Sequence, residues 1–211
     1  MSFPRVYPIL DTQLLAARKC ETETAATAWI EGGARILQFR HKGQWTRTAL
    51  AQAEQIATLC RANGVTFVVN DRTDIAKLLD AGLHLGQDDL PPRDARCLLG
   101  REGIMGYSTH NLRQLATAVA EPVDYLAIGP VFATASKENP DPIVGLDELR
   151  RCRALSPRSL VAIGGITRDS ASAVFAAGAD SVAIIGDLLP ESCTRANLRR
   201  RMEEWLQRAQ S

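Results

Sequence analysis

The chain has 211 residues, and 25 Lys and Arg residues against 24 Asp and Glu residues give a formal net charge of +1. A balance this even excludes a global field that would draw the protein to nucleic acid or to a membrane surface. No run reaches the roughly 18 apolar residues of a membrane-spanning helix. The five cysteines are scattered and form no C-x-x-C pair, which is typical of reduced thiols, so we expect a cytoplasmic protein.

Residues 1–211 are expected to form one domain, because no linker interrupts the chain and barrels of this length are routinely single. In chain order, eight short runs rich in Val, Ile and Leu alternate with stretches of helical character. The runs cover residues 6–10, 35–40, 66–71, 83–86, 104–108, 124–128, 160–163 and 181–185. Several helices between them are predicted to end at glycine: Gly32 and Gly33, Gly64, Gly82 and Gly178.

This alternation predicts parallel strands, because parallel neighbours need a long crossover connection. Eight evenly spaced units favour an α/β fold of the closed (β/α)8 TIM-barrel type, with a doubly wound open sheet as the alternative. The last helix carries Leu198, Met202, Trp205 and Leu206 at helical spacing and is predicted to close the barrel. In such a barrel the active site lies at the C-terminal ends of the strands. The polar residues collect there, which indicates an enzyme.

The second run ends in a segment that alternates polar and apolar side chains. In an extended chain Gln38, Arg40 and Lys42 share one face, while Leu37 and Phe39 point to the other. An amide beside two cations is typical of a receptor for a polar heterocycle that carries phosphate. The alternative interpretation is a solvated strand end with scattered charges.

Two carboxylates, Asp71 and Asp89, follow adjacent strands and are predicted to reach one point above the barrel. With no histidine cluster and no thiolate pair beside them, they suit a hard cation, Mg²⁺ before Zn²⁺. As an alternative, Asp71 caps the helix near Thr73 and Asp89 caps the turn before Pro91. For the pair we favour the metal.

Glycines follow the last two strands, as Gly164 and Gly165 and as Gly186. Exposed backbone N–H groups at these strand ends form the usual phosphate site of such barrels, and tight turns are the alternative. A second cluster has charge enough for a diphosphate and consists of the predicted metal with Arg40, Lys42 and Lys137. A diphosphate beside Mg²⁺ suggests a leaving group.

The histidines and aromatic residues are less informative. His84 lies within the fourth run and is predicted to fill the core, and His41 alternates away from Arg40 and is predicted to be structural. His110 fits a helix start and a substrate contact equally well. The aromatic residues form no stacking stripe, which argues against a nucleic-acid channel.

Seven segments stand in order at the predicted strand ends. They read QFRHK at 38–42, VND at 69–71, LGQDD at 85–89, GYSTH at 106–110, GPVFATASK at 129–137, AIGGI at 162–166 and GAD at 178–180. Together they resemble the bacterial thiamine-phosphate synthase family over essentially the whole chain. The resemblance implies a barrel enzyme that joins the pyrimidine and thiazole halves of thiamine.

The resemblance also implies roles at single positions. The pyrimidine diphosphate would be held by Gln38, Phe39, Arg40, His41, Lys42, Asn70, Ser108 and Lys137, with Arg40, Lys42, Ser108 and Lys137 as the catalytic residues. The thiazole phosphate would be held by Thr134, Ala135, Ser136, Gly165, Ile185 and Gly186, and the cofactor Mg²⁺ by Asp71 and Asp89. The implied reaction is a dissociative substitution, in which diphosphate leaves and the thiazole nitrogen attacks the resulting methylene cation.

The chain departs from the family pattern at two places. Ser136 stands where the family has a second threonine, and Gly186, followed by Asp187, stands where many members have serine. Asp187 would repel a phosphate unless it points away. The alternative functions are a thiazole tautomerase-like paralogue and a non-catalytic phosphate-ligand-binding barrel. The expected partners are small-molecule substrates, with no nucleic acid and no membrane. A homo-oligomer is possible.

Overall fold

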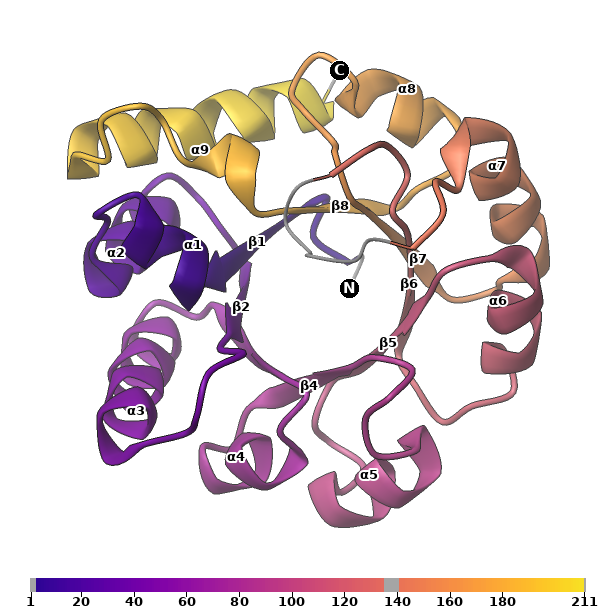
Figure 1. Ribbon diagram of the computed structural model, residues 1–211, viewed down its shortest axis with the longest axis horizontal. Coiled ribbons are helices and arrows are strands. Elements are labelled where there is room, and N and C mark those ends of the chain that lie inside the picture. The colour runs from indigo at the N-terminus through magenta and orange to yellow at the C-terminus, as the bar shows by residue number, and fades with distance from the viewer. Residues whose placement is uncertain (1–2, 135–140, 211) are drawn as a thin grey trace.

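A computed structural model describes residues 3–134 and 141–210. Within them eight parallel strands close into a barrel in chain order, with the first strand paired to the last (Figure 1). The strands are β1 (Val6–Asp11), β2 (Ile36–Arg40), β3 (Thr66–Asn70), β4 (Gly82–Leu85), β5 (Met105–Thr109), β6 (Tyr125–Ile128), β7 (Ser159–Ile163) and β8 (Ser181–Ile184). Each strand end lies within one residue of its prediction, and the closed barrel is confirmed over the open sheet.

Helices surround the barrel on its outside (Figure 1). They are α1 (Thr12–Ala17), α2 (Thr22–Glu31), α3 (Arg47–Ala62), α4 (Thr73–Leu78), α5 (Pro92–Leu99), α6 (Leu112–Ala118), α7 (Gly145–Leu155), α8 (Ala171–Ala176), α9 (Arg195–Gln210) and the short 3-10 helix η1 (Gly186–Leu188). Gly33, Gly64 and Gly178 follow helix ends with positive φ, as predicted. The prediction for Gly82 is wrong: it begins β4, and the left-handed residue after α4 is Asp80, with φ 51°.

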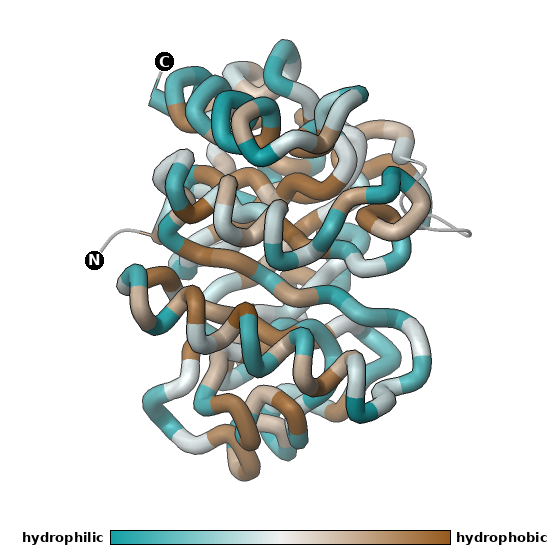
Figure 2. The backbone as a smooth tube through the Cα atoms, turned by 90° about the vertical axis from the view of Figure 1, so that its left-hand side faces the viewer, coloured by the Kyte–Doolittle hydropathy of each residue, from teal (hydrophilic) through white to brown (hydrophobic). Residues whose placement is uncertain are grey.

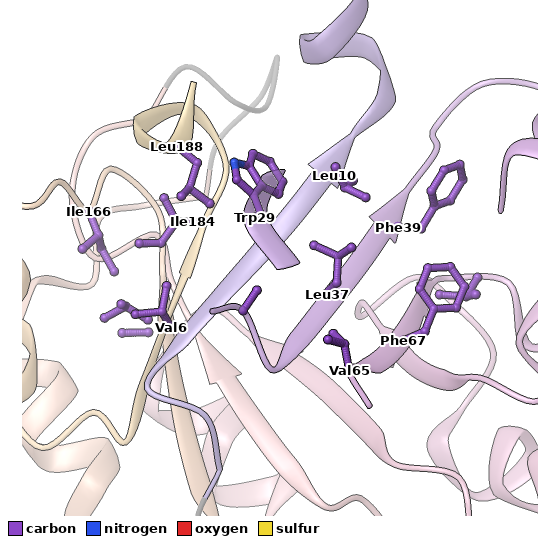
Figure 3. Packing of buried hydrophobic residues seen from close by; sticks show 14 of the residues in the cluster. Val6, Leu10, Trp29, Leu37, Phe39, Val65, Phe67, Ile166, Ile184 and Leu188 are labelled. Atoms are coloured by element: carbon purple, nitrogen blue, oxygen red, sulfur yellow. The ribbon is translucent and has the colours of Figure 1, made fainter. Parts of the chain in front are cut away.

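Two apolar layers hold the barrel together, because strands buried on both faces send alternate side chains inward and outward. Outward-facing residues such as Leu37 and Leu10 pack under the helices, as Figure 3 shows. Inward-facing residues such as Val68 and Val161 fill the barrel interior. Figure 2 shows the resulting hydrophobic bands along the strands, with hydrophilic positions on the outer turns of the helices.

Helix α9 closes the barrel against α2 and α8, as predicted. Leu198, Met202 and Trp205 form its buried stripe, while the charged residues between them are exposed or half-buried. None of the helices in the described part of the chain is long and apolar enough to cross a membrane.

Candidate active site

The carboxyl ends of neighbouring strands carry predicted site residues on the inward face of the barrel. On β2, Gln38 and Arg40 alternate with the outward-facing Phe39, as predicted. Asn70 ends β3 two residues beyond the inward-facing Val68 and is buried. Because β2 and β3 are paired, these three polar side chains meet at one end of the barrel.

Arg40 is held by Asp11, an acidic neighbour that the sequence analysis missed. Asp11 ends β1, which pairs with β2, and its Oδ2 accepts a hydrogen bond from Nη1 of Arg40. Its other oxygen, Oδ1, accepts from the backbone N–H of Leu14 at 2.9 Å and so caps α1. The exposed fractions are 7% for the Asp11 side chain and 15% for Arg40, so solvent screens this pair little. The cap fixes the carboxylate, and the carboxylate orients the guanidinium.

Asp71 and Asp89 come together above β3 and β4, as the sequence predicts. Their carboxyl groups lie within hydrogen-bonding reach of each other. Nζ of Lys42 lies 2.6 Å from Oδ2 of Asp71. Oδ2 of Asp89 accepts from the backbone N–H of Gly86 at 2.6 Å and closes the turn after β4. The cluster therefore joins two carboxylates to one of the predicted cations.

Asp71 is not the helix cap that was its alternative interpretation, whereas Asp89 does close the turn before Pro91, as its own alternative interpretation expects. The N-cap position of α4 is Arg72, which makes no side-chain capping bond, and the N-cap position of α5 is Pro91. Asp71 instead adopts φ 66°, in the left-handed region that non-glycine residues rarely occupy. Such backbone strain clusters at functional sites, where the surrounding structure enforces it.

The Asp89 carboxyl is unfavourably placed as an anion. Burial raises the pKa of Asp89 to about 6, and the neighbouring Asp71 adds to this, whereas the Gly86 N–H and the Lys42 ammonium oppose it. A cation shared by the two carboxylates would relieve that repulsion. Residues 3–134 and 141–210 contain no group of three or more His, Cys, Asp or Glu that could hold a metal, so an ion here would take further ligands from water or substrate.

The turn after β7 uses two glycines in left-handed conformations. Gly164 has φ 98° and Gly165 has φ 64°. A Cβ on Gly164 would lie 2.5 Å from Pro130, and a Cβ on Gly165 would collide with the carbonyl oxygen of Ala133. The loop after β6 therefore packs directly on this glycine turn. Thr134 directly follows Ala133, the residue of that loop that the turn contacts.

Gly186 begins η1 where β8 ends, directly after Ile185. A Cβ at Gly186 would meet nothing within 4 Å, so this strand end has open space beside it. The Asp187 carboxylate lies 3.2 Å from Nε of Arg168, and the Asp187 carbonyl accepts a hydrogen bond from Nη1 of Arg201 at 2.8 Å. Arg168, which also pairs with Glu204, thus offsets part of the charge of Asp187.

Two residues predicted to hold the pyrimidine diphosphate have side chains outside the site. Phe39 is fully buried in the outer layer and packs on the ring of Trp45, so its side chain points away from Arg40, and its predicted contact stays a prediction. The physical reason is the strand alternation, which turns Phe39 away from the face of Arg40. The His41 ring is hydrogen-bonded to the Thr12 hydroxyl at 2.8 Å and to the carbonyl of Gln44. These bonds confirm the structural role predicted for His41, and its binding role stays a prediction.

Three predicted residues, Ala135, Ser136 and Lys137, lie outside the described residues, so the structure does not place them. His110, whose role the sequence left open, lies with Nδ1 2.7 Å from the carbonyl oxygen of Gly129, at the start of the loop after β6.

A buried hydrogen-bonded chain inside the barrel was not predicted. Nε2 of Gln38 donates to the Tyr7 hydroxyl at 3.0 Å, and the hydroxyls of Tyr7 and Tyr125 are 2.9 Å apart. The His84 ring lies between Tyr125 and Ser108, 2.9 Å from each. The core position predicted for His84 is confirmed. Two tyrosines at inward-facing strand positions were the available signal, because a buried phenol needs a hydrogen-bond partner.

The fold and the site together define a (β/α)8 barrel that gathers cations, paired carboxylates and glycine turns at the C-terminal ends of its strands. Residues 6–188 match the protein-family model described as thiamine monophosphate synthase. The chain belongs to the thiamine monophosphate synthase family, and the resemblance seen in its motifs is confirmed.

Individual relatives agree with this assignment. The chain is 45% identical over 200 residues to a thiamine-phosphate synthase of Koribacter versatilis, and the match covers 93% of this chain and 94% of the relative. A thiamine-phosphate synthase of Moorella thermoacetica is 39% identical, with 94% of each chain covered. The solved thiamine phosphate pyrophosphorylase from Pyrococcus furiosus has a TM-score of 0.83 at 30% identity, covering 98% of this chain and 95% of that one. The prediction that the protein is an enzyme is confirmed.

Proposed function

We propose that the protein is a thiamine-phosphate synthase, which couples hydroxymethylpyrimidine diphosphate to thiazole phosphate and releases diphosphate and thiamine monophosphate. The observation that carries the proposal is the cluster of Arg40, Lys42, Asp71 and Asp89 at one end of the barrel. Two cations and three carboxylates, counting the Asp11 that pairs with Arg40, suit a diphosphate bound together with a divalent cation, since carboxylates alone would repel it.

Asp71 and Asp89 would hold the Mg²⁺ of such a complex. The donor set fits this ion, because both ligands are carboxylate oxygens and their mutual repulsion is relieved by positive charge. Lys42, already 2.6 Å from Asp71, would help balance the diphosphate. When bound, Mg²⁺ would stabilise the charge that develops on the departing diphosphate.

The protein's own side chains would bind and orient the pyrimidine diphosphate and stabilise its leaving group. Gln38, Asn70 and Ser108 would hold the pyrimidine, and Arg40, oriented by Asp11, would bind diphosphate oxygens. This interaction strengthens as the leaving group gains charge, which is the condition for lowering the barrier. Lys137 is proposed as a third cation. A dissociative substitution at carbon needs no general base for the carbon–nitrogen bond.

The thiazole phosphate would lie over the ends of β7 and β8. Gly165 and Gly186 allow a phosphate to approach the backbone closely, and Thr134 would add a hydroxyl. Ile185, Ala135 and Ser136 are proposed to complete this subsite. Pairing of Asp187 with Arg168 supports the proposal, because it weakens the repulsion that Asp187 would otherwise cause.

We expect Asp11→Asn to raise the Michaelis constant for the pyrimidine diphosphate by about tenfold. The change removes one partner of a charge-assisted hydrogen bond, a type of bond worth about 1.5–3 kcal/mol, so Arg40 loses its fixed orientation. Asparagine is as good a helix cap as aspartate, so α1 keeps its cap. Steady-state kinetics of both substrates measure the effect, with the exposed pair of Arg72 and Asp74 supplying the control variant Asp74→Asn. An equal effect of the two variants would contradict the role given to Asp11.

We expect Gly186→Ser to lower the Michaelis constant for the thiazole phosphate by about tenfold. The serine side chain has room, because nothing lies within 4 Å of its Cβ, and its hydroxyl would add a hydrogen bond to a charged group. The constant for the pyrimidine diphosphate is expected to stay the same. An unchanged constant for the thiazole phosphate would mean that this strand end does not contact it.

The alternative functions make different products. A tautomerase-like paralogue would release no diphosphate from the two substrates, and a binding protein would bind both without turnover. The formation of thiamine monophosphate from the two substrates tests the proposal directly.

A further inference from the structure

Two residues proposed to hold the pyrimidine, Gln38 on β2 and Ser108 on β5, are the ends of one buried hydrogen-bonded chain. Its inner members are Tyr7, Tyr125 and His84, and neighbouring members are 2.9–3.0 Å apart. The exposed fractions are 1% for Tyr7, 0% for Tyr125 and 8% for His84. Since water hardly reaches Tyr7 and Tyr125, the protons of these two hydroxyls have to find their acceptors within the chain.

With the Gln38 amide oriented as in the structure, only one direction of the hydrogen-bonded chain satisfies every member. Nε2 of Gln38 can only donate, so the Tyr7 oxygen accepts and the single Tyr7 proton goes to Tyr125. The single Tyr125 proton then goes to Nδ1 of His84. Burial raises the pKa of Tyr7 and of Tyr125, so both phenols keep these protons at neutral pH. His84 therefore carries its own proton on Nε2 and donates it to Oγ of Ser108.

This direction gives the two ends opposite hydrogen-bonding characters. The Gln38 amide keeps its carbonyl oxygen Oε1 as an acceptor, and the Ser108 hydroxyl, which accepts from His84, has its own proton left to donate. Reversing the Gln38 amide would require every bond of the chain to reverse with it. The orientation of the Gln38 amide and the direction of the hydrogen bonds can therefore change only together. Tyr7, Tyr125 and His84 link the two.

We propose that Tyr7, Tyr125 and His84 are positioning residues that lock this direction and so select an amino-substituted pyrimidine over its oxo counterpart. The inference rests on the proposed function. The exocyclic amino group would donate to Oε1 of Gln38, and an acceptor atom of the same substrate would receive the Ser108 proton. An oxo analogue has a carbonyl in place of the amino group and an N–H in place of the adjacent ring nitrogen. Its carbonyl oxygen, which is an acceptor, would lie opposite Oε1 of Gln38, which is also an acceptor. Neither oxygen would then have a hydrogen-bond donor.

The first test reads the direction of the chain without any substrate. In the full-length protein labelled with ¹⁵N in its histidines, the ring nitrogen shifts of His84, assigned with the variant His84→Gln, report where the proton lies. We expect a neutral ring with the proton on Nε2. A proton on Nδ1, alone or in an imidazolium, would overturn the proposal. This result is independent of whether the protein couples the two substrates.

The second test measures selectivity as a ratio of binding constants. Calorimetric binding of the amino and the oxo pyrimidine diphosphates, with Mg²⁺ and without the thiazole phosphate, is expected to favour the amino compound by about a hundredfold or more in the unaltered protein. Tyr125→Phe removes the central proton, frees the Gln38 amide to turn, and is expected to reduce this ratio by about tenfold. Tyr7→Phe breaks the same hydrogen-bonded chain, and it replaces Tyr125→Phe in this measurement if that variant does not fold.

The matched control is Phe3→Leu. The Phe3 ring packs on the rings of Tyr125 and Tyr7, with centroids 4.8 and 5.9 Å away, and takes no part in the hydrogen-bonded chain. Loosened packing lowers both binding constants alike, so the ratio is expected to stay unchanged in this control. An unchanged ratio in Tyr125→Phe and Tyr7→Phe, or an equal loss in Phe3→Leu, would overturn the assignment. Failure of both compounds to bind the unaltered protein would instead count against the proposed function.

Discussion

Asp89→Asn is expected to lower kcat/KM for coupling by about a hundredfold or more, because it removes half of the charge that would hold Mg²⁺ against the diphosphate. The asparagine oxygen can still accept the hydrogen bond from Gly86 that closes the turn after β4. The local backbone is therefore expected to persist while the metal site fails. Initial rates over a series of Mg²⁺ concentrations measure the effect, and moderate Mg²⁺ is not expected to restore the rate.

The neighbouring exposed carboxylate supplies the control, Asp88→Asn, which is expected to keep its rate. Stability provides a second check. The folded protein raises the pKa of Asp89 to about 6, so the stability that its protonated carboxyl contributes at low pH is lost as the pH rises from the ordinary carboxyl range through about 6. Without metal at neutral pH, Asp89→Asn is thus expected to melt at the same temperature as the parent or higher. Retained coupling activity would remove Asp89 from the site.

Gly165→Ala is expected to raise the Michaelis constant for the thiazole phosphate by at least about tenfold and to leave the pyrimidine diphosphate constant nearly unchanged. The new Cβ would collide with the Ala133 carbonyl oxygen and come within 2.8 Å of Cβ of Phe132, so the loop that leads to Thr134 has to move. A displacement of about 1 Å is enough to cost a large factor in a positioned site. Kinetics with each substrate varied in turn measure the effect.

The control for this change is Gly64→Ala. Gly64 has the same φ of 64°, but a Cβ there meets nothing within 4 Å, and it lies in the turn between α3 and β3. This variant carries the backbone strain without the collision, so it is expected to lose some stability and keep both Michaelis constants. A rise in the thiazole constant of similar size in both variants would show that strain, and not the position of the loop, is responsible.

The architecture was predictable because every strand is a short apolar run set off by helical stretches, and parallel pairing leaves few ways to arrange eight such units. Asp71 and Asp89 could be placed together for the same reason, since they end neighbouring strands. The pattern failed where two signals compete. Gly82 looked like a helix terminator, but it begins β4, where a Cβ would lie 3.0 Å from the carbonyl oxygen of Ile104.

The finer contacts depend on side-chain directions that no spacing rule supplies. Phe39 and His41 lie inside the QFRHK motif, but alternation turns their side chains away from Arg40, so the side chains of a contiguous motif do not all share one face. Asp11 reaches Arg40 only because β1 and β2 are paired in one particular register. The chain from Gln38 to Ser108 joins strands far apart in the sequence across a closed barrel, and only the three-dimensional structure reveals it.

The most direct test of the account is diphosphate release when the purified protein is mixed with hydroxymethylpyrimidine diphosphate and thiazole phosphate, with and without Mg²⁺. We expect release that requires both substrates and the metal, with thiamine monophosphate formed in equal amount. Binding of the substrates without any release, or release that does not depend on the thiazole phosphate, would contradict it.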